Sequence, residues 1–291
     1  MTPVVLSVKI SLMRIGLHVS IAGKIYESLD RARALGCNTM QIFSRNPRGW
    51  QAQALDAADV KEFRRLKSEY DIAPVAVHIP YIINLASPDA KLYARSVDSY
   101  VEDIKRADRL GAECFVTHLG SHVGTGEAAG MRRFSEALNE IIKRADPKAM
   151  ILLETTAGSG DQLGYEFKQI RSIIDGVKKK DKIGVCLDTA HVFAAGYDLR
   201  TAAGLDKMLK SFDRELGLDR LKVIHFNDSL SEFGSRVDRH QHIGKGKIGL
   251  AALKRVINHP KLKGAAFIME TPKITEKDDK MNMAAAKRMI S

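Results

Sequence analysis

The chain has 291 residues, of which 45% are hydrophobic, and a formal net charge of +11. No apolar run approaches the about 18 to 20 residues of a membrane-spanning helix, and the opening segment lacks the charged start and cleavage site of a signal peptide. The three cysteines, Cys37, Cys114 and Cys186, lie within or beside apolar segments and form no thiolate zinc motif. These features argue against a helical membrane protein and a disulfide-built secreted domain, and predict one domain in the reducing cytoplasm.

The positive net charge indicates attraction to a polyanion. Charge alone is weak evidence, because many basic proteins bind no nucleic acid. The three lysines at residues 178–180 are most simply the solvated end of a helix. Basic and aromatic residues on the loops that border a predicted site are therefore more informative than the total charge.

Short apolar runs alternate with amphipathic stretches along the chain. The apolar runs predict eight strands, at residues 15–20, 39–44, 75–78, 114–118, 149–154, 183–188, 221–226 and 265–270. The amphipathic stretches predict helices at residues 23–35, 57–69, 89–110, 126–145, 163–177, 200–216, 249–258 and 280–290. Gly36, Gly111 and Gly217 follow three of these helices as stop signals. Strands that alternate with helices indicate a parallel sheet, and eight such units favour a closed (β/α)8 TIM barrel over an open sheet.

Histidines and acidic residues stand at or just beyond the ends of the predicted strands. They are His78, His118, Glu154, Asp188, His191, His225, Asp238, His240 and Glu270. Because all strand C-termini of a TIM barrel meet at one rim, residues far apart in the sequence would line one cavity. Imidazoles mixed with carboxylates are ligands of catalytic metal ions, so the sequence predicts a metal site at the C-terminal rim.

Two local motifs strengthen this prediction. Asp188 ends the sixth strand and His191 follows three residues later, so a carboxylate and an imidazole can reach neighbouring metals. Asp238 and His240 are spaced i, i+2, which in extended structure points both to one face. Either motif alone is better explained by a hydrogen-bonded loop histidine. Chance rarely places histidines or glutamates at the ends of five further strands, so the combined pattern favours a metal site.

Several segments resemble the endonuclease IV family of apurinic/apyrimidinic endonucleases. The motifs are GLHVS (16–20), NPRGW (46–50), INL (83–85), DTAHVFAAGYDLRT (188–201) and FGSRVDRHQHIGKGKIG (233–249). The resemblance runs from about residue 15 to about residue 270. We therefore predict a short N-terminal extension at residues 1–14 and a TIM-barrel endonuclease domain at residues 15–291. Ile79, Leu119 and Ala190 depart from the family's pattern, but none is a predicted ligand.

The resemblance implies three zinc ions per chain, with manganese as an alternative at one position. It assigns one ion to His78, His118 and Glu154, a second, bridged by Glu154, to Asp188, His225 and Glu270, and a third to His191, Asp238 and His240. It further implies hydrolysis of the phosphodiester 5′ to abasic sites, which leaves a 3′-OH, together with trimming of blocked 3′ ends. Glu154 and Glu270 are the implied catalytic residues, and Glu154 would position the attacking water.

The implied partner is double-stranded DNA with abasic sites or blocked 3′ ends, bound by a monomer. By resemblance Arg48, Tyr81 and Ile82 insert into bent DNA and fill the space left by the abasic nucleotide. Ordinary loop packing remains the alternative for Tyr81 and Ile82. Trp50 either supports the Arg48 loop or is a plain loop residue, and a basic pair at residues 245 and 247 either contacts phosphates or is merely exposed. We leave His18 outside the ligand set, with a hydrogen bond to a ligand as its alternative role.

Two rival functions stay open from the sequence. A metal-dependent sugar isomerase or epimerase of the xylose-isomerase-like barrels shares the fold and the strand-end ligands. It usually needs one or two metals, so the group of His191, Asp238 and His240 would be surplus. A non-catalytic DNA-damage binding protein would not need all nine metal positions.

Overall fold

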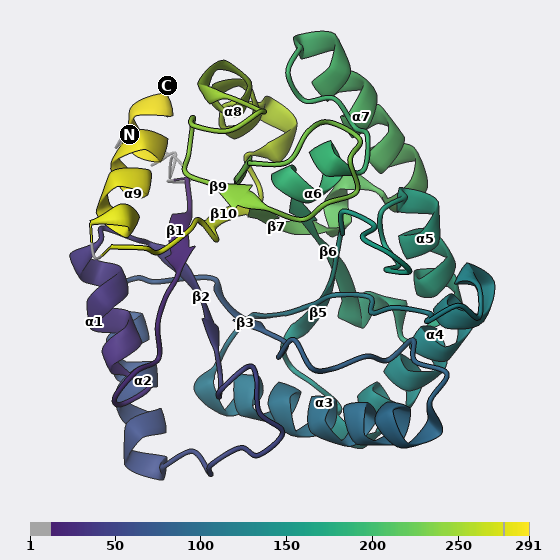
Figure 1. Cartoon of the computed structure of the whole chain (residues 1–291). Helices are drawn as coiled ribbons and strands as arrows, with labels where there is room; N and C mark the ends of the chain where they lie inside the picture. Colours follow the sequence, from purple (N-terminus) through teal and green to yellow (C-terminus); the bar gives the residue numbers. More distant parts are fainter. Residues whose placement is uncertain (1–12, 276, 291) are drawn as a thin grey trace, which may run out of the picture.

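Eight parallel strands close into a barrel in the order β1-β10-β7-β6-β5-β4-β3-β2 (Figure 1). The strands are β1 (Ile15–His18), β2 (Thr39–Phe43), β3 (Val75–His78), β4 (Cys114–Thr117), β5 (Met150–Glu154), β6 (Ile183–Asp188), β7 (Leu221–His225) and β10 (Ala266–Met269). This computed structural model describes residues 13–275 and 277–290. Most of the predicted N-terminal extension, residues 1–12, lies outside the described residues. The predicted single TIM barrel is confirmed.

Helices surround the barrel and follow the strands in the predicted order (Figure 1). They are α1 (Glu27–Ala34), α2 (Ala57–Glu69), α3 (Ala90–Leu110), α4 (Glu127–Ala145), α5 (Phe167–Gly176), α7 (Ala202–Leu216), α8 (Leu250–Ile257) and α9 (Asp278–Met289). Local chemistry sets their ends: the Asp56 and Asp89 carboxylates accept backbone N–H groups at the start of α2 and α3. Gly111 ends α3 with a φ of 72°, a conformation that glycine adopts without strain. None of the helices described in the structure is long and apolar enough to cross a membrane.

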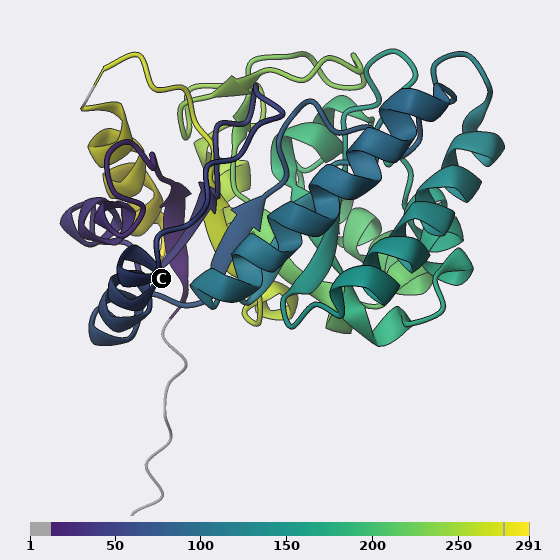
Figure 2. The ribbon, with the colours of Figure 1, turned by 90° about the horizontal axis from the view of Figure 1, so that it is seen from below.

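Two short pieces of structure were not predicted. The helix α6 (Thr189–Ala194) directly follows β6, and its first N–H groups donate to the Asp188 carboxylate. The strands β8 (Asp228–Ser229) and β9 (His240–Gln241) pair as a small antiparallel sheet. All three are too short for a hydrophobic period to show. In Figure 2 the segment that contains β8 and β9 runs along one edge of the barrel.

The barrel interior is apolar at one level and polar at the next. A buried cluster fills the inside with Ala76, Cys114, Val116, Leu152, Cys186, Val223 and Ile268. Six strands continue, two residues later, to His78, His118, Glu154, Asp188, His225 and Glu270. Because alternate side chains of a strand face the same side, each of these polar residues stands directly above an apolar one. The strand period therefore brings six predicted site residues to one level of the barrel.

A buried ion pair holds the loop between β2 and α2, residues 44–56. The Arg45 guanidinium donates to both Asp103 oxygens at 2.6 and 2.8 Å, and to the Ser99 hydroxyl at 2.7 Å. It also donates to the carbonyl oxygen of Gly49, which ties the tip of the loop to α3. Burial raises the pKa of Asp103 despite the favourable pairing with Arg45. The pair is therefore costly to bury and serves to position the loop.

We predict that Asp103→Ala lowers the free energy of unfolding by about 3–5 kcal/mol, because it leaves the Arg45 charge buried and unpaired. Urea denaturation of the purified protein measures this loss. Glu62→Ala serves as the control, since its pair with Arg65 is exposed at the surface and its loss should barely move the unfolding midpoint. A loss below about 1 kcal/mol for Asp103→Ala would show that the loop does not depend on the pair.

Candidate metal centre

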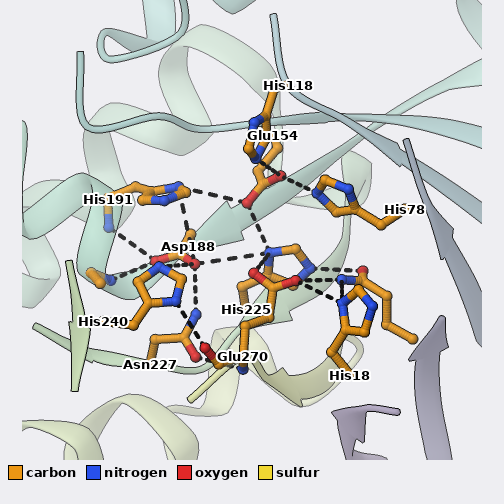
Figure 3. Close-up of polar contacts among 12 residues, drawn as sticks. His18, His78, His118, Glu154, Asp188, His191, His225, Asn227, His240 and Glu270 are labelled. Atoms are coloured by element: carbon orange, nitrogen blue, oxygen red, sulfur yellow. Dashed lines mark hydrogen bonds and ion pairs between the residues drawn. The ribbon is translucent and has the colours of Figure 1, made fainter. Parts of the chain in front are cut away.

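The nine predicted ligand residues come together at the C-terminal rim of the barrel, and Figure 3 labels all of them except Asp238. Strand ends provide His78, Glu154, Asp188 and His225, while His118 and Glu270 directly follow β4 and β10. The other three come from α6, from β9 and from the loop before β9: His191, His240 and Asp238. Glu154, Asp188 and His225 are completely buried, whereas the Asp238 side chain is 41% exposed.

Glu154 lies between two groups of ligand atoms. Its Oε2 is 3.2 Å from His78 Nε2 and 3.0 Å from His118 Nε2. Its Oε1 faces the other way, 2.8 Å from His225 Nδ1 and 3.6 Å from His191 Nδ1. One carboxylate thus presents a different oxygen to each group, which is the arrangement of a bridging ligand.

The second group surrounds His225. Its Nδ1 lies 3.3 Å from Glu270 Oε2 and 3.8 Å from Asp188 Oδ2. One ligand atom each from Glu154, Asp188, His225 and Glu270 falls within 4.8 Å of the others. Three carboxylates and one imidazole therefore converge on one point.

The third group differs in part from the expectation. Here the atoms that lie within 4.8 Å of one another belong to Asp188, His191 and His240. The carboxylate of Asp238 stands beside them, with oxygens 3.2 Å from His191 Nε2 and 3.3 Å from His240 Nε2. The sequence had placed Asp238 here and Asp188 only in the second group. The structure places Asp188 between the two groups.

Hydrogen bonds at the far side of each ring set which nitrogen faces the centre. In His78, His191 and His240, Nδ1 lies 2.7–3.0 Å from a backbone carbonyl oxygen. A carbonyl only accepts, so Nδ1 carries the proton and Nε2 faces inward. Asn227 Nδ2 donates to Asp188 Oδ2 at 2.7 Å, while its Oδ1 accepts the Glu270 N–H at 2.7 Å. Such outer contacts are typical of metal sites, where they orient the ligands.

Neighbouring acidic and imidazole groups in the site shift one another's pKa values. Burial works against the ionised carboxylate of Glu154, but the nearby His118 and His225 rings outweigh it and hold its pKa well below the ordinary value. Burial likewise works against a charged His191, yet the carboxylate of Asp188 raises its pKa well above the ordinary value. Glu154 is therefore ionised in the buried centre and needs positive charge beside it.

The residues fit divalent metal ions. His191 Nε2 and His240 Nε2 are buried and make no hydrogen bond within the described residues, although acidic oxygens lie close by. A buried nitrogen without a partner is costly, and a metal ion would satisfy it. Within the described chain, all the ligand atoms of these groups are imidazole nitrogens or carboxylate oxygens, a set that suits zinc or manganese.

A cavity of about 550 Å³ opens above the three groups. Its wall includes Phe43 and Tyr81, whose ring centroids are 5.3 Å apart. Tyr81 is 61% exposed, and Ile82 next to it is half-buried. The side chain of Arg48 is exposed in the turn that follows β2. Two of the three predicted DNA contacts, Arg48 and Tyr81, are thus exposed at the surface.

The indole ring of Trp50 contacts the side chain of Arg95. The guanidinium carbon of Arg95 lies 4.2 Å from the centroid of the Trp50 ring, in a cation–π contact between the loop and α3. This contact agrees with the expected supporting role of Trp50.

Sequence reasoning missed two residues that touch the centre, Gln41 and Asn227. Both are completely buried and hydrogen-bond to candidate ligands. Gln41 interrupts an apolar strand, and a buried polar residue in such a position was the signal that could have revealed it. His18, left outside the ligand set, has Nδ1 3.2 Å from Glu270 Oε1, which matches its alternative role.

Comparisons with known proteins agree with this geometry. Residues 29–290 match the family model of the xylose isomerase-like TIM barrel. A protein of Halothermothrix orenii named "Probable endonuclease 4" is 45% identical over 266 residues, which cover 91% of this chain and 96% of that protein. The protein of the same name from Methanoculleus marisnigri is 43% identical and covers 94% of this chain and 98% of its own length.

Solved structures give the same result at the level of the fold. The crystal structure of endonuclease IV from Thermus thermophilus has a TM-score of 0.85 at 36% identity and covers 95% of this chain and 98% of that one. A D-tagatose 3-epimerase-like protein has a TM-score of 0.72 at 19% identity, with 95% of this chain and 97% of that chain covered. The second likeness shows the fold alone. The relatives at 43–45% identity, matched over nearly their whole length, show that this chain belongs to the endonuclease IV family.

Proposed function

We propose that this protein is a metal-dependent DNA-repair endonuclease. It hydrolyses the phosphodiester 5′ to abasic sites in double-stranded DNA, leaves a 3′-OH, and removes blocking groups from 3′ ends. The observation that carries this proposal is the position of Glu154, whose two oxygens face two different groups of imidazoles and carboxylates. The membership of the endonuclease IV family supports it.

The metal assignment is part of the proposal. One zinc ion would be held by His78, His118 and Glu154, and a second by Glu154, Asp188, His225 and Glu270. A third would be held by His191, Asp238 and His240, with Asp188 alongside, and manganese would be an alternative to zinc at one position. When bound, such ions lower the pKa of water to about 7 and stabilise negative charge on phosphate oxygens. This chemistry matches phosphodiester hydrolysis at neutral pH.

The proposed catalytic residues of the chain are two glutamates, Glu154 and Glu270. Glu154 Oε1 and Oε2 are acceptors only, so this residue would face both groups and orient the attacking water between them. Glu270 borders the cavity, with Oε2 3.3 Å from His225 Nδ1 and Oε1 3.2 Å from His18 Nδ1. Both are held by several contacts, so neither needs to reorganise during the reaction.

Substrate choice belongs to the loops at the rim. An abasic nucleotide has lost the stacking that keeps it in the duplex, so its extrusion into the cavity costs less than that of an intact nucleotide. Arg48, Tyr81 and Ile82 are proposed to insert into the bent duplex and fill the space left behind. The exposure of Tyr81 in the cavity wall and of Arg48 in the turn after β2 supports this role. One chain supplies all these loops, which supports action as a monomer, and the three buried free thiols support a cytoplasmic location.

The sugar isomerase alternative is weaker. Its support lies in epimerase structures at 19% identity or below, which share only the fold. The relatives at 43–45% identity are endonucleases by name, and a third group of ligand atoms exceeds the one or two metals of such isomerases.

The first test is the metal content. We expect three divalent ions per chain by elemental analysis of protein purified without chelator, and two for His240→Ala. His259→Ala is the matched control, because His259 hydrogen-bonds to Asp206 outside the metal centre and its loss should leave three ions. Chelation should lower the melting temperature, since ions that bind only the folded state stabilise it. A count of one in the unaltered protein would favour the isomerase.

The second test removes the charge of Glu154. Glu154→Gln keeps the shape of the side chain, so the fold and much of the affinity for abasic duplex should persist while kcat falls by about 10²–10³-fold, because the preorganised charge between the two groups is lost. Incision of a labelled abasic duplex measures the rate, and a filter-binding titration measures the affinity. Glu102→Gln, an exposed carboxylate on α3, should cleave normally. Full activity of Glu154→Gln would rule out this mechanism.

The third test separates the loops from the metals. The double substitution Arg48→Ala with Tyr81→Ala should raise KM for abasic duplex by about 5–150-fold, the range expected for a lost stacking contact of about 1–3 kcal/mol. Its metal content should be normal. The effect should shrink on a blocked 3′ end at a gap, which needs little distortion. Arg171→Ala, on the outer surface of α5, is the control. Equal loss on both substrates, or none, would place the selectivity in the cavity instead.

A further inference from the structure

Gln41 lies within β2, and its side chain contacts two residues of the candidate metal centre. It is completely buried, and its backbone pairs in register with His18 of β1 and Ala76 of β3. Its side chain contacts residues from three other strands or strand ends. Gln41 Nε2 is in hydrogen-bond contact with Glu270 Oε1 and lies 3.0 Å from His18 Nδ1, while Gln41 Oε1 lies 2.9 Å from His225 Nε2.

The direction of each hydrogen bond follows from the chemistry of the groups. The ionised Glu270 carboxylate only accepts, so the Gln41 NH₂ must donate to it. The Gln41 carbonyl oxygen only accepts, so His225 must donate from Nε2. Nδ1 is therefore the nitrogen of His225 that is turned toward Glu154. A flipped amide would set oxygen against oxygen and N–H against N–H, so the network has a single polarity.

The same amide also fixes which oxygen of Glu270 is free. Gln41 and His18 both occupy Glu270 Oε1. Glu270 Oε2 is left to face His225 Nδ1 at 3.3 Å, inside the second group of ligand atoms. One side chain thus determines the inward atom of two candidate ligands.

A structural role alone does not explain a glutamine at this position. The site of Gln41 adjoins the apolar interior of the barrel, where an unpaired amide costs free energy and a leucine would pack without penalty. Within the described residues, the hydrogen bonds of the Gln41 side chain join it to His18, His225 and Glu270. Its polar group therefore serves the centre.

We propose that Gln41 is a positioning residue, which through one amide sets the ring of His225 and the carboxylate of Glu270 to receive a divalent cation. This inference rests on the proposed function, because it concerns the same metal centre. Outer contacts of this kind typically change metal affinity by about 10–100-fold.

The test replaces Gln41 by leucine, which removes the hydrogen bonds to His225 and Glu270 at nearly constant side-chain volume. Gln41→Asn is the second variant: it keeps the amide but withdraws it by one methylene, so it cannot reach both partners and remains informative if the leucine variant folds poorly. Thr39→Val is the matched control, since Thr39 is equally buried on the same strand and donates a hydrogen bond to the Pro74 carbonyl oxygen away from the centre.

Two readouts besides activity decide the outcome. In the zinc-loaded full chain, a chromophoric chelator should withdraw one zinc ion about 10–100-fold more readily from Gln41→Leu and Gln41→Asn than from the unaltered protein or Thr39→Val. With cobalt in place of zinc, the visible absorption bands of one site should shift in the Gln41 variants alone, because they report ligand geometry.

The outcomes distinguish the two proposals. If the unaltered protein holds its ions and both Gln41 variants match it in zinc release and cobalt spectrum, the positioning role is wrong while the proposed function stands. If the unaltered protein holds no divalent ion, the proposed function fails and the role of Gln41 falls with it.

Discussion

The rest of the site depends on the contacts that compensate the buried charge of Glu154. An ionised carboxylate without solvent is tolerated only where positive charge or hydrogen-bond donors surround it. Glu154 meets this condition on both sides, with His118 Nε2 3.0 Å from one oxygen and His225 Nδ1 2.8 Å from the other. Because this single carboxylate is compensated on two sides, two groups of candidate ligands lie next to each other and share Glu154. The arrangement of these two groups then follows from one residue.

The barrel meets this demand through the alternation of its strands. Apolar side chains of the interior cluster stand two residues before the polar residues of six strands, so one face of each strand carries both. A shift of any of these strands by one residue would turn its ligand away from the centre and its apolar residue out of the core. Packing of the core and assembly of the site therefore select the same register. The outer contacts from Asn227 and from backbone carbonyls then fix the rotation of each ligand.

Most of the fold could be predicted from the sequence, because eight apolar strands and eight amphipathic helices carry strong periodic signals. The helix α6 and the pair β8 and β9 could not, since six residues or two residues carry no period. Six of the nine candidate ligands could be selected because they stand at or directly after the ends of barrel strands, and their convergence follows from barrel geometry. His191, Asp238 and His240 were indicated by their local spacing and by the family resemblance. Gln41 was missed because it lies in the middle of a strand and not at its end, where the candidate ligands were sought. The closeness of Asp188 to His240 depends on how the loop before β9 folds back, which no local pattern specifies.

The candidate metal centre and the loop at residues 44–56 are held in place by different kinds of interaction. Metal binding and the proposed DNA contact can therefore depend on separate parts of the structure. The ligands stand on strands of the barrel, whose packing leaves little freedom for displacement. The loop that carries Arg48 lacks such a core and is tied to α3 by the buried pair of Arg45 and Asp103 and by the stacking of Arg95 on Trp50. Polar anchors specify a position by direction as well as distance, so they hold a surface loop in place where apolar contacts are few. A residue that we propose to enter a distorted duplex can thus be presented in one conformation, without any part of the candidate metal centre taking part in the contact.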